Sequence, residues 1–289
     1  MTAGVGLVLE GGGMRATYTG GVLDALLDAG IDLEYVIGVS AGANAGADYV
    51  AGQRDRNRVV FVDQVADPRY AGWRNLLRER SWFGMDFLFE TLPDRVAPFD
   101  YEAFRASRRT LVVGLTDCAG GDAVYLRHRD HEPRWFMHTA LRATCALPVL
   151  SRPVSIGGRL YVDGGVSDSI PVVRAIADGY PRVVVVLTRN AGYRKPAPRF
   201  ATAGRLLLAR HPAVYRGLRS RHLRYNASLD LVEAMERAGS AFVFRPQLAL
   251  QVSRMERDLA RLDALYRQGY DETRARVPEL QAWLTEPAA

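Results

Sequence analysis

VGLVLEGGGMRATYTGGVLDALLDAG, residues 5–30, is the stretch that decides the fold of this chain. Its apolar run at residues 5–9 predicts a buried strand, and three consecutive glycines follow at residues 11–13. The apolar stripe of a helix then starts near Tyr18 and ends at Gly30, a typical C-terminal stop. A strand, a glycine loop and a helix in this order can hold an anion on backbone N–H groups. The sequence does not yet say which anion this loop would hold.

The segment YVIGVSAGANAGADYVAG, residues 35–52, predicts a second strand followed by a second helix rich in Ala and Gly. Further strands are expected at 110–116, 123–126, 183–187 and 241–244, and helices at 134–146 and 170–178. A turn around Gly157 and Gly158 indicates a hairpin. Because short strands alternate with helices, we expect an α/β fold with a mostly parallel sheet.

The composition is that of an ordinary globular chain, with 48% of the 289 residues hydrophobic and 24% charged. No run of 18 apolar residues occurs, so we predict no membrane-spanning helix. The first residues lack the basic and apolar regions of a secretory signal. Two cysteines, Cys118 and Cys145, are too few for a disulfide framework. A cytoplasmic protein is therefore expected.

Positive charge is concentrated in residues 189–229, which hold ten basic residues and no acidic one, although the chain carries a net charge of only +6. These residues are Arg189, Arg194, Lys195, Arg199, Arg205, Arg210, Arg216, Arg219, Arg221 and Arg224. Such a basic segment is typical of a solvated helix surface, or of a surface that meets anionic lipid head groups or nucleic acid.

Aromatic residues are concentrated in residues 70–104, an irregular stretch that holds nine of the 27 aromatic side chains. Two interpretations stay open. The segment can form a cap that lines a groove for an acyl chain, or it can pack as the core of a small subdomain.

The glycine loop by itself fits the dinucleotide fingerprint G-x-G-x-x-G/A at Gly11, Gly13 and Ala16. Asp32 or Glu34 then stands about twenty residues further on, where a ribose-binding acid is expected. This pattern makes a dinucleotide-binding oxidoreductase one hypothesis for the chain.

A second motif, GVSAG at residues 38–42, changes this interpretation. It is G-x-S-x-G between a predicted strand and a predicted helix, the context of a nucleophile elbow. Gly38 and Gly42 leave room for the sharp turn, and Ser40 is placed at the head of a helix. There the Ala41 N–H can stabilise negative charge.

A nucleophilic serine needs a base, and the five histidines do not provide an obvious one. His128, His131, His138, His211 and His222 all stand in charged or basic segments, away from Gly-rich strand ends. Asp163 is different, because it ends a predicted strand and precedes Gly164 and Gly165. We therefore expect Asp163 at the same edge of the sheet as Ser40 and the glycine loop.

The motifs GGGMR, GVSAG and DGG, in this order and all at strand ends, resemble those of the patatin-like phospholipase family. The block ATCALPVLSRPV, residues 143–154, is similar to the one that precedes the family's aspartate. The resemblance covers about residues 5–190, is closest to the cytosolic bacterial branch, and departs from it at Ala16, where many relatives have glycine.

The resemblance implies a three-layer patatin-like fold, with a catalytic domain at 1–190 and a mostly helical C-terminal extension at 191–289. It implies a Ser–Asp dyad without histidine, with Ser40 as nucleophile and Asp163 as general base. Its oxyanion hole would be formed by Gly11, Gly12 and Gly13, with Arg15 in the family's basic position. For efficient proton transfer, Asp163 is expected to be partly desolvated and close to Ser40.

The expected function is hydrolysis of fatty-acyl esters by a phospholipase A or carboxylesterase type of enzyme, without metal or cofactor. The expected partners are a phospholipid or another fatty-acyl ester, with no nucleic acid. Peripheral contact with the anionic inner face of a membrane is a further hypothesis, and the oligomeric state stays open. The alternatives are a catalytically weak lipid-binding protein on the same scaffold and the dinucleotide-binding oxidoreductase.

Overall fold

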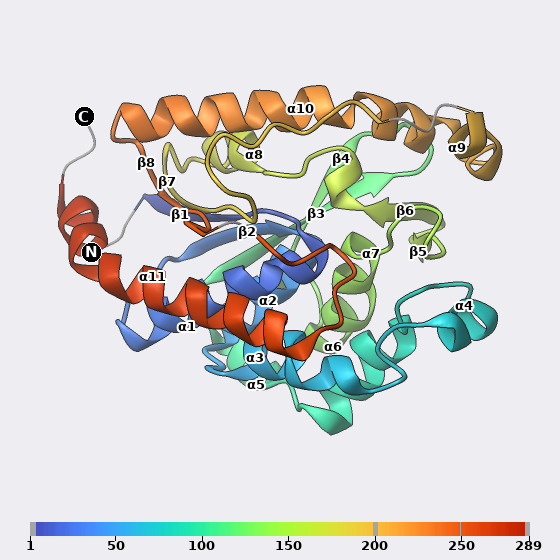
Figure 1. The fold of residues 1–289 in the computed structure, drawn as a ribbon, viewed down its shortest axis with the longest axis horizontal. Coiled ribbons are helices and arrows are strands. Elements are labelled where there is room, and N and C mark those ends of the chain that lie inside the picture. The colour runs from blue at the N-terminus through green and yellow to red at the C-terminus, as the bar shows by residue number, and fades with distance from the viewer. Residues whose placement is uncertain (1–3, 199–201, 249, 287–289) are drawn as a thin grey trace.

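The computed structural model describes residues 4–198, 202–248 and 250–286 as one mixed α/β fold with a central sheet between two layers of helices (Figure 1). The strands are β1 (Val5–Leu9), β2 (Tyr35–Val39), β3 (Thr110–Asp117), β4 (Ala123–Arg127), β5 (Val154–Ile156), β6 (Arg159–Asp163), β7 (Arg182–Val186) and β8 (Ala241–Phe244). Their order along the sheet is β5-β6-β3-β2-β1-β7-β8, and β4 pairs with β3. The three-layer, mostly parallel architecture predicted from the sequence is confirmed.

The strands of the parallel part are buried on both faces, because a layer of helices covers each face of the sheet. Successive side chains of a strand point to opposite faces and so enter two different cores. In β1, Leu7 and Leu9 belong to the apolar core on one face, and Val8 to the core on the other. The first core includes residues of α1 (Thr17–Asp28), α2 (Ala41–Ala51) and α11 (Leu259–Thr285). The second includes residues of α8 (Val172–Ala177) and α10 (Pro212–Arg237). Figure 1 shows these two helical layers on opposite sides of the sheet.

The remaining helices are short. They are α3 (Arg56–Phe61), α4 (Trp73–Glu79), α5 (Tyr101–Ala106), α6 (Pro133–Trp135), α7 (Arg142–Thr144) and α9 (Thr202–Leu207). Two π-helical turns, η3 (Phe87–Val96) and η5 (Phe136–Leu141), join some of them, so the predicted helix at 134–146 is α6, η5 and α7 in succession. Helix η1 (Gly13–Ala16) is a 3₁₀ turn that leads into α1.

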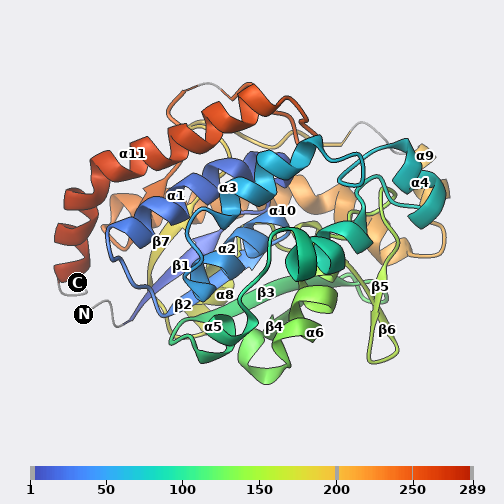
Figure 2. The same cartoon turned by 90° about the horizontal axis from the view of Figure 1, so that it is seen from below.

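The expectation that residues 70–104 are irregular needs correction, because α4, η3 and the start of α5 lie within them. Helix α11 continues through Pro278 and packs along α1 (Figure 2). Arg199 of the basic segment lies outside the described residues.

The sheet also determines where the sequence motifs meet. In β1 and β2, Leu9 is paired with Gly38, so the glycine loop and Ser40 both follow at the same edge. Strand β3 continues beyond the end of β2, and its last residues pair with β6 running in the opposite direction. Strand β4 pairs with one edge of β3 over Val112–Thr116. Strand β6 therefore pairs with the other edge of β3, the edge with which β2 also pairs, beyond the point where β2 ends. Strands β2 and β6 therefore meet end to end.

Candidate active site

Ser40 stands at a sharp turn between β2 and α2, with backbone angles of φ 55° and ψ −135°. A side chain other than glycine pays for this conformation with about 1–3 kcal/mol of strain. The neighbouring glycines make the turn possible, because a methyl group at Gly42 would lie 2.5 Å from the Glu10 carbonyl oxygen. A methyl group at Gly38 would lie 2.8 Å from the Cα of Ala43. The turn therefore has the steric features of a nucleophile elbow.

The Ser40 hydroxyl donates a hydrogen bond to Oδ2 of Asp163 at 2.7 Å. This contact follows from the sheet, since Val39 pairs with Gly114 and Asp163 pairs with the next residue of β3, Leu115. The other carboxylate oxygen of Asp163 accepts a hydrogen bond from the Gly165 N–H at 2.7 Å. Both ends of the carboxylate are thus fixed, and one of them is directed at the serine.

Asp163 is only 3% exposed and Ser40 only 7%. Burial raises the pKa of the Asp163 carboxyl above its ordinary value, while the hydrogen bond from Ser40 and the positive charge of Arg221 act in the opposite direction. The expected desolvation and proximity of the two residues are both present in this geometry. A carboxylate with a raised pKa is a better proton acceptor than an exposed one.

Thr144 holds the backbone of the serine turn and was not singled out from the sequence. Its hydroxyl accepts a hydrogen bond from the Ser40 N–H at 2.8 Å and donates one to the Gly114 carbonyl at 2.6 Å. The sequence gives only one indication of this role, which is that Thr144 belongs to the block at residues 143–154. No local pattern indicates which member of that block reaches the serine.

The amides of the glycine loop do not all have the same freedom. The Gly11 N–H donates to the Ser169 carbonyl at 3.2 Å, and the Met14 N–H donates to the Arg254 carbonyl at 3.1 Å. Within the described parts of the chain, no acceptor is present for the N–H groups of Gly12 and Gly13. The expectation for Gly11 is therefore corrected, since its amide is already engaged.

Gly11 is instead needed for close approach of the loop to the serine. A methyl group on Gly11 would lie 3.0 Å from the Val39 carbonyl oxygen and 3.2 Å from the Ser40 Cβ. Gly13 has φ +58°, which favours glycine, and lines the cavity beside Ser40 together with Ala41. The Ala41 N–H, at the first turn of α2, also has no acceptor among the described residues. Two backbone donors beside the Ser40 cavity, the N–H groups of Gly13 and Ala41, are thus without a described acceptor, and so is the Gly12 N–H of the same loop.

Arg15 does not line this cavity. Its side chain is 5% exposed, and the neighbouring charges are those of Arg189, Arg254 and Glu10. Burial, together with the two other guanidinium groups, lowers the pKa of Arg15 to about 10. Arg15 therefore lies beside the charges around Glu10 rather than in the wall of the Ser40 cavity.

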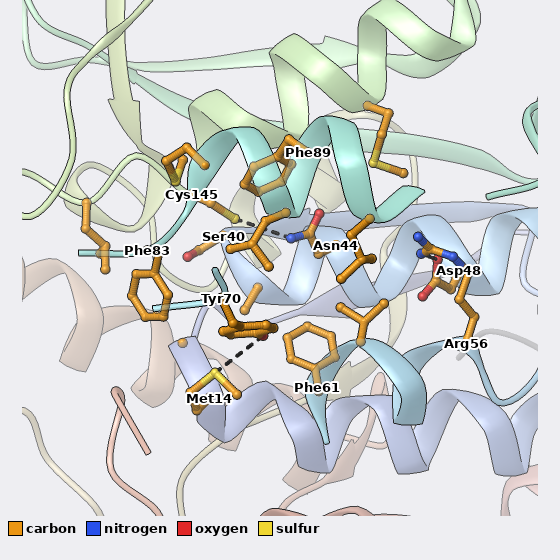
Figure 3. Close-up of a pocket in the computed structure, with 18 residues that line it drawn as sticks. Met14, Ser40, Asn44, Asp48, Arg56, Phe61, Tyr70, Phe83, Phe89 and Cys145 are labelled. Atoms are coloured by element: carbon orange, nitrogen blue, oxygen red, sulfur yellow. Dashed lines mark hydrogen bonds and ion pairs between the residues drawn. The ribbon is translucent and has the colours of Figure 1, made fainter. Parts of the chain in front are cut away.

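Ser40 opens into a narrow, mainly apolar cavity of about 70 Å³ (Figure 3). The aromatic segment contributes Tyr70, Phe83, Leu88, Phe89 and Leu92 to its wall. Other side chains of the same segment, such as Phe99 and Phe104, are buried in the main core. The part of the segment next to Ser40 thus lines the cavity, and the rest packs into the main core rather than into the core of a separate subdomain. That the cavity takes an acyl chain stays a prediction.

The end of the cavity far from Ser40 is closed by a buried ion pair (Figure 3). Arg56 Nη1 lies 2.5 Å from Asp48 Oδ1, and these side chains are 9% and 2% exposed. Asn44 lies between Ser40 and Asp48 on the same face of α2, because residues three and four apart are neighbours on a helix. Residues 40–48 of α2 therefore form one wall of the cavity along its length.

Cys145 is a second potential nucleophile beside Ser40. Its thiol accepts a hydrogen bond from Asn44 at 3.6 Å and lines the same cavity. Burial, and the charge of Asp163, raise the pKa of the Cys145 thiol well above its usual value. The thiol is therefore protonated and a poor nucleophile at neutral pH.

None of the histidines within the described residues lines the cavity that holds Ser40. His128 accepts a hydrogen bond from the Leu111 N–H at 2.9 Å, and burial lowers its pKa to about 4. His138 contacts Asp94 instead. In the same described ranges, no group of three or more His, Cys, Asp or Glu side chains is placed to hold a metal ion.

The model of the patatin-like phospholipase family matches residues 7–176, which include Ser40, Asp163 and the glycine loop. The chain belongs to the patatin-like phospholipase family. A second family model, a domain of unknown function (DUF6363), matches residues 211–285. The patatin-like part therefore ends before β7, and the second match contains α10, β8 and α11.

Relatives of this patatin-like chain occur in bacteria and fungi. An uncharacterized protein, YjjU of Escherichia coli, is 30% identical over 195 residues, which are 64% of this chain and 52% of that protein. Lysophospholipase NTE1 of Debaryomyces hansenii is 27% identical over 283 residues, 92% of this chain but 17% of that protein. The chain thus spans about half the length of YjjU and much less of NTE1.

The crystal structure of VipD from Legionella pneumophila has a similar fold. It matches with a TM-score of 0.51 and 14% sequence identity, covering 97% of this chain and 66% of that one. At this identity the likeness concerns the patatin-like fold alone. No helix within residues 4–198, 202–248 and 250–286 combines the length and apolarity that crossing a bilayer requires.

Proposed function

We propose that this patatin-like chain is a serine acyl hydrolase of the phospholipase A or lysophospholipase type. The observation that carries the proposal is the 2.7 Å hydrogen bond from the Ser40 hydroxyl to Asp163 at the end of an apolar cavity. Ser40 attacks the carbonyl carbon of an acyl ester while Asp163 accepts its proton. The dyad needs no histidine, because the desolvated carboxylate is itself the base.

The tetrahedral oxyanion is stabilised by backbone N–H groups of the glycine loop and of the first turn of α2. Gly12, Gly13 and Ala41 are the candidates, because their amides are free of acceptors among the described residues. The alcohol then departs with the proton from Asp163, which leaves an acyl-serine. A water molecule that loses its proton to Asp163 next attacks this acyl ester, so that the fatty acid is released and Ser40 is regenerated.

The test is turnover of p-nitrophenyl butyrate by Ser40→Ala and Asp163→Ala variants. Each substitution is expected to lower kcat by about 10³-fold or more, as for other units of nucleophile and base. Ser81→Ala is the matched control, because Ser81 is buried and its hydroxyl contacts Ser151 at 2.7 Å, outside this cavity. Undiminished turnover in Ser40→Ala would exclude Ser40 as the nucleophile.

The same experiment separates hydrolysis from the alternative of a lipid-binding protein without turnover. A dinucleotide-binding oxidoreductase has little support, because the glycine loop contacts Ser40 and Asp32 is paired with Arg109 at 2.6 Å. A cytoplasmic location, independence of metals and cofactors, and the absence of nucleic-acid partners stay predictions.

We also propose peripheral contact with an anionic membrane surface. The exposed apolar side chains Trp73 and Leu77 lie on α4, and Leu206 and Leu207 lie on α9. Both views place these two helices at the same end of the molecule (Figures 1 and 2). Arg205 and Arg210 flank the two leucines, so co-sedimentation with phosphatidylglycerol vesicles should weaken as salt is added. It should also weaken in the Leu206→Ser/Leu207→Ser double variant, which lacks the exposed apolar side chains of α9. Binding that is insensitive to both changes would contradict this contact.

A further inference from the structure

Five cationic side chains lie around Glu10 and Asp163, outside the wall of the apolar cavity of Ser40. They are Arg15, Arg189, Lys195, Arg221 and Arg254. The positive charge of each interacts electrostatically with that of at least one other member of the cluster. None of the five forms an ion pair within 4.0 Å of a carboxylate in the described chain. Other buried or half-buried arginines, such as Arg56, do form such pairs.

The two nearby carboxylates are occupied by neutral donors. Glu10 accepts hydrogen bonds from the Thr188 N–H at 2.6 Å and the Tyr225 hydroxyl at 2.7 Å. Asp163 accepts from Ser40 and Gly165, as described above. The cluster consequently has more positive than negative charge in a partly buried place, which is unfavourable unless an anion binds there or Lys195 loses its proton.

Side-chain contacts leave most of this charge without a partner. The Nε atoms of Arg15 and Arg189 are buried and have no acceptor among the residues that the structure describes, and Arg15 is 5% exposed. Arg221 donates one hydrogen bond, to the Ser169 hydroxyl at 3.1 Å. Lys195 Nζ lies 4.1 Å from the centre of the Tyr225 ring, a contact that attracts a cation without neutralising it.

The cations line two cavities near the carboxylate of the dyad. Lys195, Arg221 and Arg254 line a cavity of about 830 Å³. Arg221 and Arg254 also line a smaller cavity of about 150 Å³ that contains Asp163. Leu147 lines both this smaller cavity and the apolar cavity of Ser40.

A substrate with its ester at Ser40 would therefore have an apolar space on one side and a cationic space on the other. We propose that Lys195, Arg221 and Arg254 bind the phosphate group of the substrate, so that the esters hydrolysed are those of phospholipids or lysophospholipids. This inference rests on the proposed function. It assigns a role to residues outside the patatin-like match, two of which lie in the match to the domain of unknown function.

The experiment uses the fact that Lys195 is the only lysine of the chain. Reductive methylation with ¹³C-formaldehyde labels its amine and the N-terminal amine, and keeps the positive charge. The label is followed by NMR in Ser40→Ala, which cannot turn over substrate by the proposed route. The probes are 1-octanoylglycerol 3-phosphate, 1-octanoylglycerol and inorganic phosphate, all below any critical micelle concentration.

We expect the octanoyl phosphate to shift the Lys195 resonance and to raise its apparent pKa from about 7. The groups that face Lys195 are Arg15, Arg221, Arg254, Glu10 and the Tyr193 and Tyr225 rings. The neutral octanoylglycerol should leave the resonance unchanged. An equal response to inorganic phosphate would assign the site to free phosphate and overturn the head-group proposal, and so would a lack of response to all probes.

Kinetics provide the second arm. Wild type should prefer the octanoyl phosphate to octanoylglycerol by at least tenfold in kcat/KM, and Lys195→Gln and Arg254→Gln should lose this preference through a higher KM. Arg216→Gln is the matched control, because Arg216 is exposed on α10, outside both cavities. A preference that survives in Lys195→Gln and Arg254→Gln overturns the site but not the hydrolase. Loss of turnover on every ester, together with an intact NMR response, overturns the hydrolase but not the site.

Discussion

The Ser40–Asp163 contact depends on the hydrogen-bond partners of one carboxylate, that of Asp163. One oxygen of Asp163 accepts the serine hydroxyl and the other accepts the Gly165 amide. Burial raises the pKa of this carboxyl, and the neighbouring Arg221 lowers it. Ser40 has to enter an unfavourable backbone region to make the contact. Strain in the serine turn and desolvation of the aspartate are both stability costs of the site.

The titration of Asp163 should appear in the pH dependence of hydrolysis. Asp163 can accept the serine proton only when it is ionised, so kcat/KM for p-nitrophenyl butyrate should fall as pH drops through its pKa in the free protein. Because that pKa is raised, this acid limb should lie above the ordinary pKa of Asp, which is about 3.9.

A variant without the charge of Arg221 tests how this cation affects the pKa of Asp163. Arg221→Gln should move the acid limb to higher pH, because the cation at present favours the ionised carboxylate. Arg216→Gln, with the same change in net charge, should leave the limb in place. A limb that stays where it is in Arg221→Gln would contradict the electrostatic link between Arg221 and Asp163.

At the scale of elements, α1 and α11 approach so closely that only glycine fits at two crossing points. A methyl group at Gly21 would lie 2.0 Å from the Tyr266 carbonyl oxygen. One at Gly269 would lie 2.2 Å from the Tyr18 carbonyl oxygen. The same interface contains the hydrogen bond from the Tyr266 hydroxyl to Asp24 at 2.5 Å. Helix α11 is thus fitted to α1 rather than loosely attached.

Gly269→Ala should therefore lower the free energy of unfolding by about 1–3 kcal/mol, as overpacking does elsewhere. This loss should occur although Ala has a higher helix propensity than Gly by about 1 kcal/mol. Gly204→Ala on α9 is the control, since its nearest contact would be an ordinary 3.6 Å, and it should be neutral or slightly stabilising. Urea unfolding of the two variants measures the difference. Equal stability of Gly269→Ala and wild type would show that the helices can separate at no cost.

For the whole molecule, the predicted division at residue 190 does not coincide with a gap in the packing. Strand β8 extends the sheet by parallel pairing with β7, and α11 shares a core with α1. The basic segment is also not a uniformly solvated surface. Arg224 donates to the Val166 carbonyl at 2.9 Å, and Arg194 pairs with Asp230 and Glu233. Residues 191–289 therefore complete the fold of residues 1–190.

A chain cut after residue 190 should not fold into a cooperative unit. It would expose the apolar residues of α1 that α11 covers and the free edge of β7. We expect binding of the dye ANS and no sharp thermal transition in circular dichroism, with rescue when residues 191–289 are added in trans. Cooperative unfolding of the truncated chain near the melting temperature of the full chain would show that the first 190 residues are an independent domain.

The sequence by itself determined the local parts of this protein. Strand β1, the glycine loop and α1 follow from apolar periodicity and from glycines, which act over a few neighbouring residues. The turn at Ser40 is determined in the same way, because Gly38 and Gly42 leave the space it needs. The DGG motif marked Asp163 as the end of a strand.

Only the tertiary structure decided how these parts meet. Asp163 reaches Ser40, 123 residues away, because β6 runs against β3 and meets the end of β2. Nothing in the sequence around either residue fixes that register. Contacts between distant segments also decide that the Gly11 N–H is not free, because it donates to the Ser169 carbonyl. They likewise bring Lys195, Arg221 and Arg254 to one cavity. Local sequence fixes backbone shape, whereas the partners of a buried charge or amide are set by the packing of the whole chain.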